Sequence, residues 1–209
     1  LALTKLDKYG DGYFEYDSKK SGGITVSNLR IKNQEFYSPF YVTHPDLVVV
    51  TKDEYFKKFD MLNTIRENGI LLINTTDKHL LNEKISKKDK EIIREKNVKV
   101  LTINASALAE ESKIKGKINK IMEVIILKLI GIENALEIVL TTIEESFKTK
   151  GTEVIENNQS AVKKAFENLE EVTLNQDGYE KENATSLFER ISRREGYQIP
   201  VSDLESICS

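Results

Sequence analysis

Residues 18–23, SKKSGG, are typical of a short basic loop and lie between two apolar runs near the start of the chain. Two consecutive glycines allow positive φ angles, so that backbone amides can converge on an anion. Lys19 or Lys20 would add positive charge, and Ser21 would add a hydroxyl donor. The sequence thus offers a phosphate-binding turn, although spacing alone somewhat favours a solvated turn with two surface lysines.

Asn104 is a second candidate, because it ends the apolar run VKVLTIN and precedes small residues. In a doubly wound sheet, ligands bind beyond the carboxyl ends of the strands. The alternative role is a helix cap, which the spacing alone favours. Asn74, Thr75 and Thr76 follow another apolar run and could line the same crevice, or simply belong to a polar turn.

The two histidines, His44 and His79, have no cysteine, histidine or carboxylate at a spacing typical of a metal site. We assign both to structural roles. We also find no Gly-x-Gly-x-x-Gly, no phosphate-loop Gly-Lys-Ser/Thr and no nucleophile elbow in the sequence. We therefore assign no catalytic residue and no metal ligand to this chain.

The elements that would position these residues alternate between strand and helix. Continuous apolar runs at 47–50, 70–73 and 98–104 predict strands that are buried on both faces. Helices are expected between them at 51–69 and 86–97, and this order predicts parallel strands with helices on both faces. Residues 12–16 and 24–31, on either side of the basic loop, alternate as strands do.

The helix expected at 51–69 depends on its cap and on one apolar face. Thr51 can cap its start, and Tyr55, Phe59, Leu62 and Ile65 are assigned to the same face. Ser86 is expected to cap the helix at 86–97.

After Asn104 the pattern becomes helical, and helices are expected at 105–111, 117–130, 135–147 and 154–172. The predicted fold class is therefore α/β, with a mostly parallel Rossmann-like sheet, flanking helices and a helical C-terminal half. The predicted domain spans residues 1–172. Residues 173–209 are expected to form a polar linker and an arm that leads to a next domain.

The composition narrows the class of protein. The chain has 209 residues, with 31 basic and 34 acidic side chains and a formal net charge of −3, which argues against a general nucleic-acid binder. Cys208 is the only cysteine, which excludes an internal disulfide and favours a cytoplasmic location. The longest apolar run, 121–132, is too short and too interrupted to span a membrane.

The stretch GYFEYDSKKSGGITVSNLRI resembles the gamma region, or domain III, of pyruvate:ferredoxin (flavodoxin) oxidoreductases. Downstream, DMLNTIRENGILLINT, LTINASALA, KGKINKIMEVIILKL and LFERISRREGYQIPVSDL follow in the family's order. The resemblance covers nearly the whole chain. It extends to relatives in which a fused flavoprotein reduces NADP.

The resemblance implies a piece of a large enzyme that makes acetyl-CoA from pyruvate with thiamine diphosphate, Mg and 4Fe-4S clusters. It implies that this region contributes to coenzyme A binding through Lys19, Lys20, Ser21 and Asn104. The implied partners are the other domains of the enzyme, a second copy in a homodimer, and ferredoxin, flavodoxin or a fused flavoprotein as electron acceptor. The isolated piece would be inactive.

Two departures and two alternatives accompany this interpretation. The glycine-rich loop that precedes the gamma region in the family is missing here, and Asn28 stands where the family often has His. The alternatives are a nucleotide-binding module, against which the missing Gly-x-Gly-x-x-Gly counts, and a purely structural α/β module.

Overall fold

The computed structural model describes residues 8–16, 25–36, 42–114, 116–175 and 177. Its strands form two sheets, one of two strands and one of four in the order β3-β4-β5-β6. The strands are β1 (Tyr9–Tyr16), β2 (Thr25–Lys32), β3 (Leu47–Val50), β4 (Ile70–Asn74), β5 (Lys99–Ile103) and β6 (Glu170–Glu171). The helices are η2 (Asp53–Lys57), η3 (Lys78–Leu80), α1 (Leu81–Lys84), α2 (Lys87–Glu95), α3 (Ala105–Glu111), α4 (Asn119–Leu129), α5 (Ala135–Phe147) and α6 (Thr152–Glu167).

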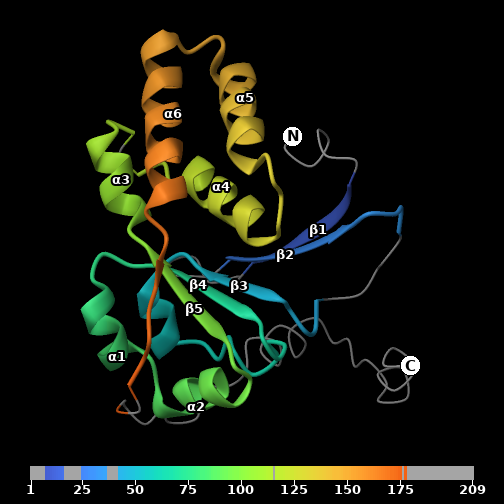
Figure 1. Cartoon of the computed structure of the whole chain (residues 1–209), viewed down its shortest axis with the longest axis vertical. Helices are drawn as coiled ribbons and strands as arrows, with labels where there is room; N and C mark the ends of the chain where they lie inside the picture. Colours follow the sequence, from blue (N-terminus) through green and yellow to red (C-terminus); the bar gives the residue numbers. More distant parts are fainter. Residues whose placement is uncertain (1–7, 17–24, 37–41, 115, 176, 178–209) are drawn as a thin grey trace.

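The three buried strands of the larger sheet are parallel, as predicted. Leu47 lies opposite Ile70 in the β3–β4 pair, and Ile70 lies opposite Lys99 in the β4–β5 pair. Figure 1 shows this sheet across the middle of the molecule, with α3–α6 above it and α1 and α2 below it. The α/β class with helices on both faces is therefore confirmed.

Alternation along the strands divides the core into two layers, because successive side chains point to opposite faces. Leu72 and Leu101 pack with α3–α6 on one face of the sheet. Leu71 and Val100 pack on the other face with Phe56 of η2 and with residues of α1 and α2. Each strand is thus covered on both faces, which explains its unbroken run of apolar residues.

The helix predicted at 51–69 is wrong. Only η2 forms there, as a 3₁₀ helix, and turns follow it to the start of β4. The side chain of Thr51 makes no cap, because the residue before the helix is Lys52 and it has no side-chain cap bond.

The spacing of the buried side chains explains this correction. Those at 53, 56, 59, 62 and 65 are all buried, and they recur every third residue. In an α-helix, residues three apart differ by about 300° around the axis, which is about 60° short of a full turn. Five side chains at this spacing would therefore point in different directions around an α-helix and would not share one face. A period of three fits a 3₁₀ helix, which is rarely long. The carbonyls of Asn63 and Ile65 instead accept hydrogen bonds from Lys96 Nζ, both at 2.7 Å.

The last predicted helix is also too long at its C-terminal end. α6 ends at Glu167, and the following Asn168 donates from Nδ2 to the Lys164 carbonyl at 2.7 Å. Glu170 and Glu171 then form β6, which pairs antiparallel with β5. The chain continues along the sheet edge, where the Val172 amide donates to the Val100 carbonyl at 3.0 Å.

The remaining predicted elements form close to their expected bounds. Ser86 caps α2 by accepting a hydrogen bond from the Asp89 amide at 3.1 Å, as predicted. β1 and β2 form an antiparallel hairpin on either side of the basic loop, which lies outside the described residues. No helix within the described part of the chain is long and apolar enough to cross a membrane.

Residues beyond the predicted boundary at 172 still contact the sheet domain. Leu174 packs against the core face that contains Leu71, and the Asn175 amide donates to Asn82 Oδ1 at 3.0 Å. Nearly all of the predicted arm, 173–209, lies outside the described residues. The boundary stays a prediction.

Gly69 is required by the close approach of β4 to the preceding turn. A Cβ atom there would lie 2.9 Å from the Arg66 carbonyl oxygen, 2.9 Å from Ile65 Cγ1 and 3.3 Å from the Asp46 carbonyl oxygen.

We expect Gly69→Ala to lower the free energy of unfolding by about 1–3 kcal/mol, because the backbone must shift. Urea denaturation measures this, with Glu91→Ala on the exposed side of α2 as a control that should change by less than about 0.5 kcal/mol. Equal stability of the two variants would show that position 69 has room for a Cβ atom, which contradicts the close approach.

Candidate functional site

A crevice of about 300 Å³ opens at the carboxyl ends of β4 and β5. This edge is where parallel α/β sheets bind their ligands. The crevice is bounded by the residues after β4, the end of β5, the start of α3 and the segment after α6. Its lining is Thr75, Thr76, Asp77, Lys78, His79, Thr102, Ile103, Asn104, Ala107, Leu108, Asn168 and Glu170.

Asn104 has two structural roles at this crevice. Its Oδ1 accepts a hydrogen bond from the Ala107 amide at 2.9 Å, which caps α3. Its Nδ2 lies 3.4 Å from the Thr76 carbonyl across the crevice. The cap that the spacing favoured is therefore present, and the same side chain lines the crevice.

Asn74 holds the carboxyl edge of the sheet together from below the crevice. Its Nδ2 donates to the Thr51 carbonyl at 3.0 Å, just after β3, and its Oδ1 accepts from the Ala105 amide at 2.9 Å, just after β5. Its side chain is buried, and the bond to the Ala105 amide is shielded from water, whereas the bond to the Thr51 carbonyl is partly buried. The ends of three strands are thereby fixed relative to one another.

Thr75 connects the crevice to a buried ion pair. Its hydroxyl donates to Asp53 Oδ2 at 2.5 Å, and Lys84 Nζ lies 2.8 Å from the same oxygen. Glu54 is a second, more exposed partner of Lys84 at 3.5 Å. The pair joins η2 to α1, directly behind the β4 edge.

The pKa values of this pair move apart. Burial raises the pKa of the Asp53 carboxyl, but the hydrogen bonds from Lys84 and Thr75 and the Lys84 charge outweigh it, so the pKa lies below its ordinary 3.8. The hydrogen bond to Asp53 is the main cause that raises the pKa of Lys84 above its ordinary 10.5. Both groups are therefore charged over the whole physiological range.

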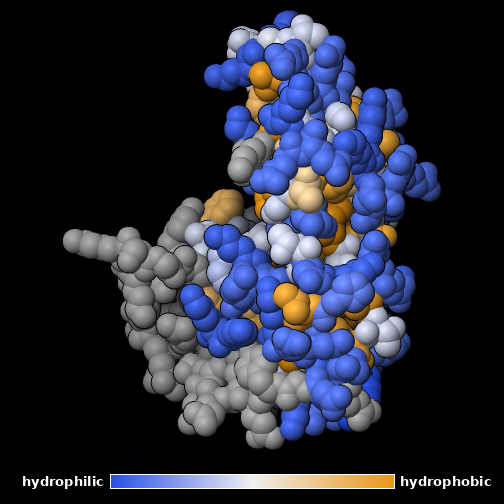
Figure 2. Space-filling view, turned by 90° about the vertical axis from the view of Figure 1, so that its left-hand side faces the viewer, coloured by the Kyte–Doolittle hydropathy of each residue, from blue (hydrophilic) through white to orange (hydrophobic). Residues whose placement is uncertain are grey.

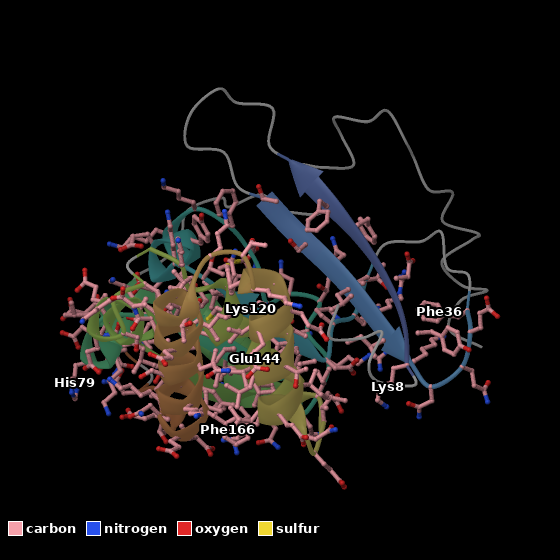
Figure 3. All side chains as sticks on the ribbon, turned by 90° about the horizontal axis from the view of Figure 1, so that it is seen from above. Lys8, Phe36, His79, Lys120, Glu144 and Phe166 are labelled. Carbon is pink, nitrogen blue, oxygen red and sulfur yellow. The ribbon has the colours of Figure 1, made fainter. Side chains whose placement is uncertain are left out.

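The mouth of the crevice carries charges of both signs. Lys78 pairs with Glu170 of β6, and both side chains are about half exposed. Asp77 Oδ1 accepts from the His79 amide at 2.9 Å, which caps η3. His79 itself is exposed and lies at the periphery of the molecule (Figure 3). The lining thus combines hydroxyls and amides with one lysine and two carboxylates, and the lysine is already paired with one of them. The hydroxyls and amides suit a polar ligand.

The predicted site residues fall into two groups. Asn104, Thr75 and Thr76 come together in the crevice, whereas Lys19, Lys20 and Ser21 lie outside the described residues. Sequence reasoning missed Asp53 and Lys84, and it missed Lys78 and Glu170. Asp53 could have been found from the sequence, because it begins a series of positions, every third residue to 65, whose other members are all large and apolar.

Metal ligands are not grouped anywhere in the described ranges. No set of three or more His, Cys, Asp or Glu side chains among these residues is arranged to hold an ion. His44 Nδ1 lies 3.2 Å from the neighbouring Thr43 hydroxyl. The described residues therefore provide no ligand set for a metal or an iron–sulfur cluster.

We expect Lys84→Met to lower the free energy of unfolding by about 3 kcal/mol, since the buried Asp53 charge then keeps only the Thr75 hydroxyl. Asp53→Asn should cost less, about 1–3 kcal/mol, because Lys84 keeps Glu54. The double variant should cost less than the sum of the two. Urea denaturation measures all three. The exposed Arg66–Asp46 pair at 3.1 Å is the matched control, and breaking it should cost less than about 1 kcal/mol.

The pH dependence follows from the lowered pKa of Asp53. Its stabilisation is complete above the unfolded pKa, near 3.8, and is lost as the pH falls through the lower folded pKa. The difference in stability between the wild type and Asp53→Asn should therefore be constant near neutrality and shrink below pH 4 or so. A difference that grows on acidification would show that the pair is not formed.

Comparison with known proteins identifies the family. The family model described as pyruvate ferredoxin/flavodoxin oxidoreductase matches residues 1–168. The pyruvate-flavodoxin oxidoreductase of Klebsiella pneumoniae is 32% identical over 174 residues, which cover 81% of this chain and 15% of that protein. The pyruvate dehydrogenase (NADP+) of Cryptosporidium parvum is 33% identical over 167 residues, which cover 78% of this chain and 9% of that protein.

Solved structures agree with the sequence relatives. The pyruvate oxidoreductase subunit PORC of Thermotoga maritima superposes with a TM-score of 0.63 at 25% identity, covering 82% of this chain and 86% of that one. A 2-oxoglutarate:ferredoxin oxidoreductase from Magnetococcus marinus shares the fold, with a TM-score of 0.53 at 13% identity, covering 88% of this chain and 29% of that one.

The chain spans 15% of the length of the Klebsiella relative and 9% of the length of the Cryptosporidium relative. The match nevertheless covers the hairpin, the parallel sheet and the helices that follow it. On this evidence the chain belongs to the pyruvate ferredoxin/flavodoxin oxidoreductase family.

Proposed function

We propose that this chain supplies the coenzyme A-binding part of a 2-oxoacid oxidoreductase that converts pyruvate to acetyl-CoA. The observation that carries the proposal is the crevice at the carboxyl edge of the sheet, which contains the strand-end Asn104 that the family resemblance assigns to coenzyme A. Lys19, Lys20 and Ser21 of the basic loop would hold phosphate or pantetheine groups of the same substrate.

The physical character of the crevice supports this assignment. Its volume of about 300 Å³ is at the lower end of the range for small-molecule sites, so it suits one portion of a long substrate. Its amide and hydroxyl groups come from rigid strand ends that Asn74 fixes, which keeps them preorganised. Lys78 at the mouth is paired with Glu170, so the positive charge for the phosphate groups would come from Lys19 and Lys20.

The rest of the chemistry belongs to other parts of the complete enzyme. Thiamine diphosphate with Mg, and 4Fe-4S clusters, would supply decarboxylation and electron transfer when bound there. One cysteine in 209 residues cannot provide the four thiolates of a cluster. This chain would therefore bind and orient coenzyme A without reacting by itself.

The complete protein would be a cytoplasmic homodimer, and it would deliver electrons to ferredoxin, flavodoxin or a fused flavoprotein. The single cysteine supports a reducing compartment.

The test is steady-state kinetics on the complete oxidoreductase that contains this chain, with coenzyme A varied. A charge-assisted phosphate contact contributes roughly 1.5–3 kcal/mol. We therefore expect Lys20→Ala to raise the KM for coenzyme A by about ten- to a hundredfold. Asn104→Ser should keep the cap of α3 and raise this KM by about threefold to tenfold, because it removes one neutral contact.

The matched control is Lys163→Ala on the exposed side of α6, which should leave the KM unchanged. Pyruvate decarboxylation without coenzyme A should stay near the wild-type rate in every variant. An unchanged KM in Lys19→Ala, Lys20→Ala and the double variant would return the loop to the status of a solvated turn. A collapse of decarboxylation itself would assign the loop to folding or assembly.

A further inference from the structure

The β1–β2 hairpin has two faces of opposite character. Residues that pair across the hairpin share a face, so Gly12 and Leu29 lie on one side with Phe14 and Ser27. Asp11 and Arg30 lie on the other side. The first set is called the outer face here, and its described members are Gly10, Gly12, Phe14, Thr25, Ser27, Leu29 and Ile31.

The outer face is uncharged and mostly exposed, and its two large exposed side chains are apolar. Phe14 is 64% exposed and Leu29 is 51% exposed, and none of the seven residues is charged. The burial pattern of β2 alternates between exposed and half-buried positions, and the exposed positions from Thr25 to Leu29 are those of the outer face. This is unusual in a chain whose residues are 31% charged.

The opposite face carries the charges and already has contacts within the chain. Asn28 Nδ2 donates to Glu15 Oε1 at 2.9 Å, and the Tyr13 hydroxyl accepts from the Val42 amide at 2.7 Å. Its described residues are half-buried from Asp11 to Glu15. The hairpin thus turns its charged side toward neighbouring residues of its own chain and its apolar side outward, the reverse of a free surface hairpin.

Gly12 shapes the outer face. A Cβ atom at this position would lie 3.5 Å from Leu29 Cδ1 and 3.3 Å from the Asn28 carbonyl oxygen. The Leu29 side chain therefore leans over the glycine. Leu29 and Phe14 are therefore the two large exposed side chains of the outer face, whose other exposed residues are small.

The hairpin lies beside the main body instead of inside it. Figure 1 and Figure 3 both show β1 and β2 alongside the helices and the larger sheet, and no third strand joins them among the described residues. A two-stranded hairpin is at best marginally stable in water without packing against another element. By contrast, the described surface seen in Figure 2 consists mostly of hydrophilic residues, with hydrophobic residues between them.

We propose that the outer face of the hairpin is a docking surface for another domain of the same oxidoreductase, which covers Phe14 and Leu29 with an apolar, uncharged surface. The length of the relatives supports this occupant, because the matched segment is only 15% of the Klebsiella protein. Most of a relative therefore lies outside the part described here. An uncharged face excludes an ionic partner surface, since charges opposite it would lose water without gaining a partner.

The inference is independent of coenzyme A binding, because it concerns a face of the strands and not the basic loop. Hydroxyl-radical footprinting of the 209-residue chain and of the complete oxidoreductase, both without coenzyme A, tests it. We expect Phe14 and Leu29 to be oxidised at least about tenfold more slowly in the complete protein, as for the fully buried centre of an interface. Tyr9, which is 48% exposed on the opposite face, is the control within the hairpin and should keep its reactivity.

Other occupants give different outcomes. Protection that appears in the 209-residue chain and rises with its concentration would assign the face to a second copy and overturn the proposal. Protection that is complete in the dilute chain would assign it to the chain's own residues, with the same consequence. Equal oxidation rates in the chain and in the complete protein would show that nothing covers the face.

A variant separates docking from folding. Leu29→Lys should leave the urea midpoint of the 209-residue chain unchanged, because the side chain is half exposed there. In the complete oxidoreductase it should speed amide exchange over residues 25–32 by about tenfold or more, because the covering domain is displaced. Leu80→Lys, at an exposed leucine of η3, is the control and should change neither measurement. Unchanged exchange in Leu29→Lys would overturn the proposal.

Discussion

The carboxamide of Asn74 is the contact on which the candidate site depends. One side chain donates to the segment after β3 and accepts from the amide that follows β5, while its own backbone ends β4. The Thr75 amide extends the ladder by donating to the Ile103 carbonyl at 3.0 Å. A carboxylate at position 74 could not donate, and an apolar residue could do neither. The crevice has rigid walls because three strand ends are joined at one buried point.

A second constraint acts on the other side of the same edge. Asp53 precedes Thr75 by 22 residues and Lys84 by still more, yet its Oδ2 lies 2.5 Å from the Thr75 hydroxyl and 2.8 Å from Lys84 Nζ. The ion pair joins the 3₁₀ helix after β3 to the short helix after β4. Its two charges tolerate burial because each has a direct partner of opposite charge. The loops around the crevice are thus held by buried polar bonds, while the sheet itself is held by apolar packing.

Sequence reasoning succeeded where the pattern is local and strong. The unbroken apolar runs 47–50 and 70–73 predicted strands covered on both faces, and the two core layers explain why this works. It failed at 51–69, where helix formers and an acidic start outweighed the period of three in the buried positions. It also missed β6, a strand of only two residues whose glutamates are exposed and give no apolar signal. Partners such as Asp53 and Lys84 have no local signature, because their meeting depends on the topology of the sheet. Asn104 was easier, since a strand-end Asn before small residues can cap and still face a crevice.

The two surfaces of interest differ in the way their chemistry is organised. The crevice presents polar groups from strand ends that are already satisfied on one side by the protein, so a ligand there meets fixed donors and acceptors. The outer face of the hairpin presents two exposed apolar side chains, Phe14 and Leu29, beside the hydroxyls of Thr25 and Ser27, so its contact energy comes mainly from burial of the two apolar groups. The basic loop connects β1 to β2 and therefore belongs to the same hairpin as that face. A domain that covers the outer face would restrict the motion of both strands.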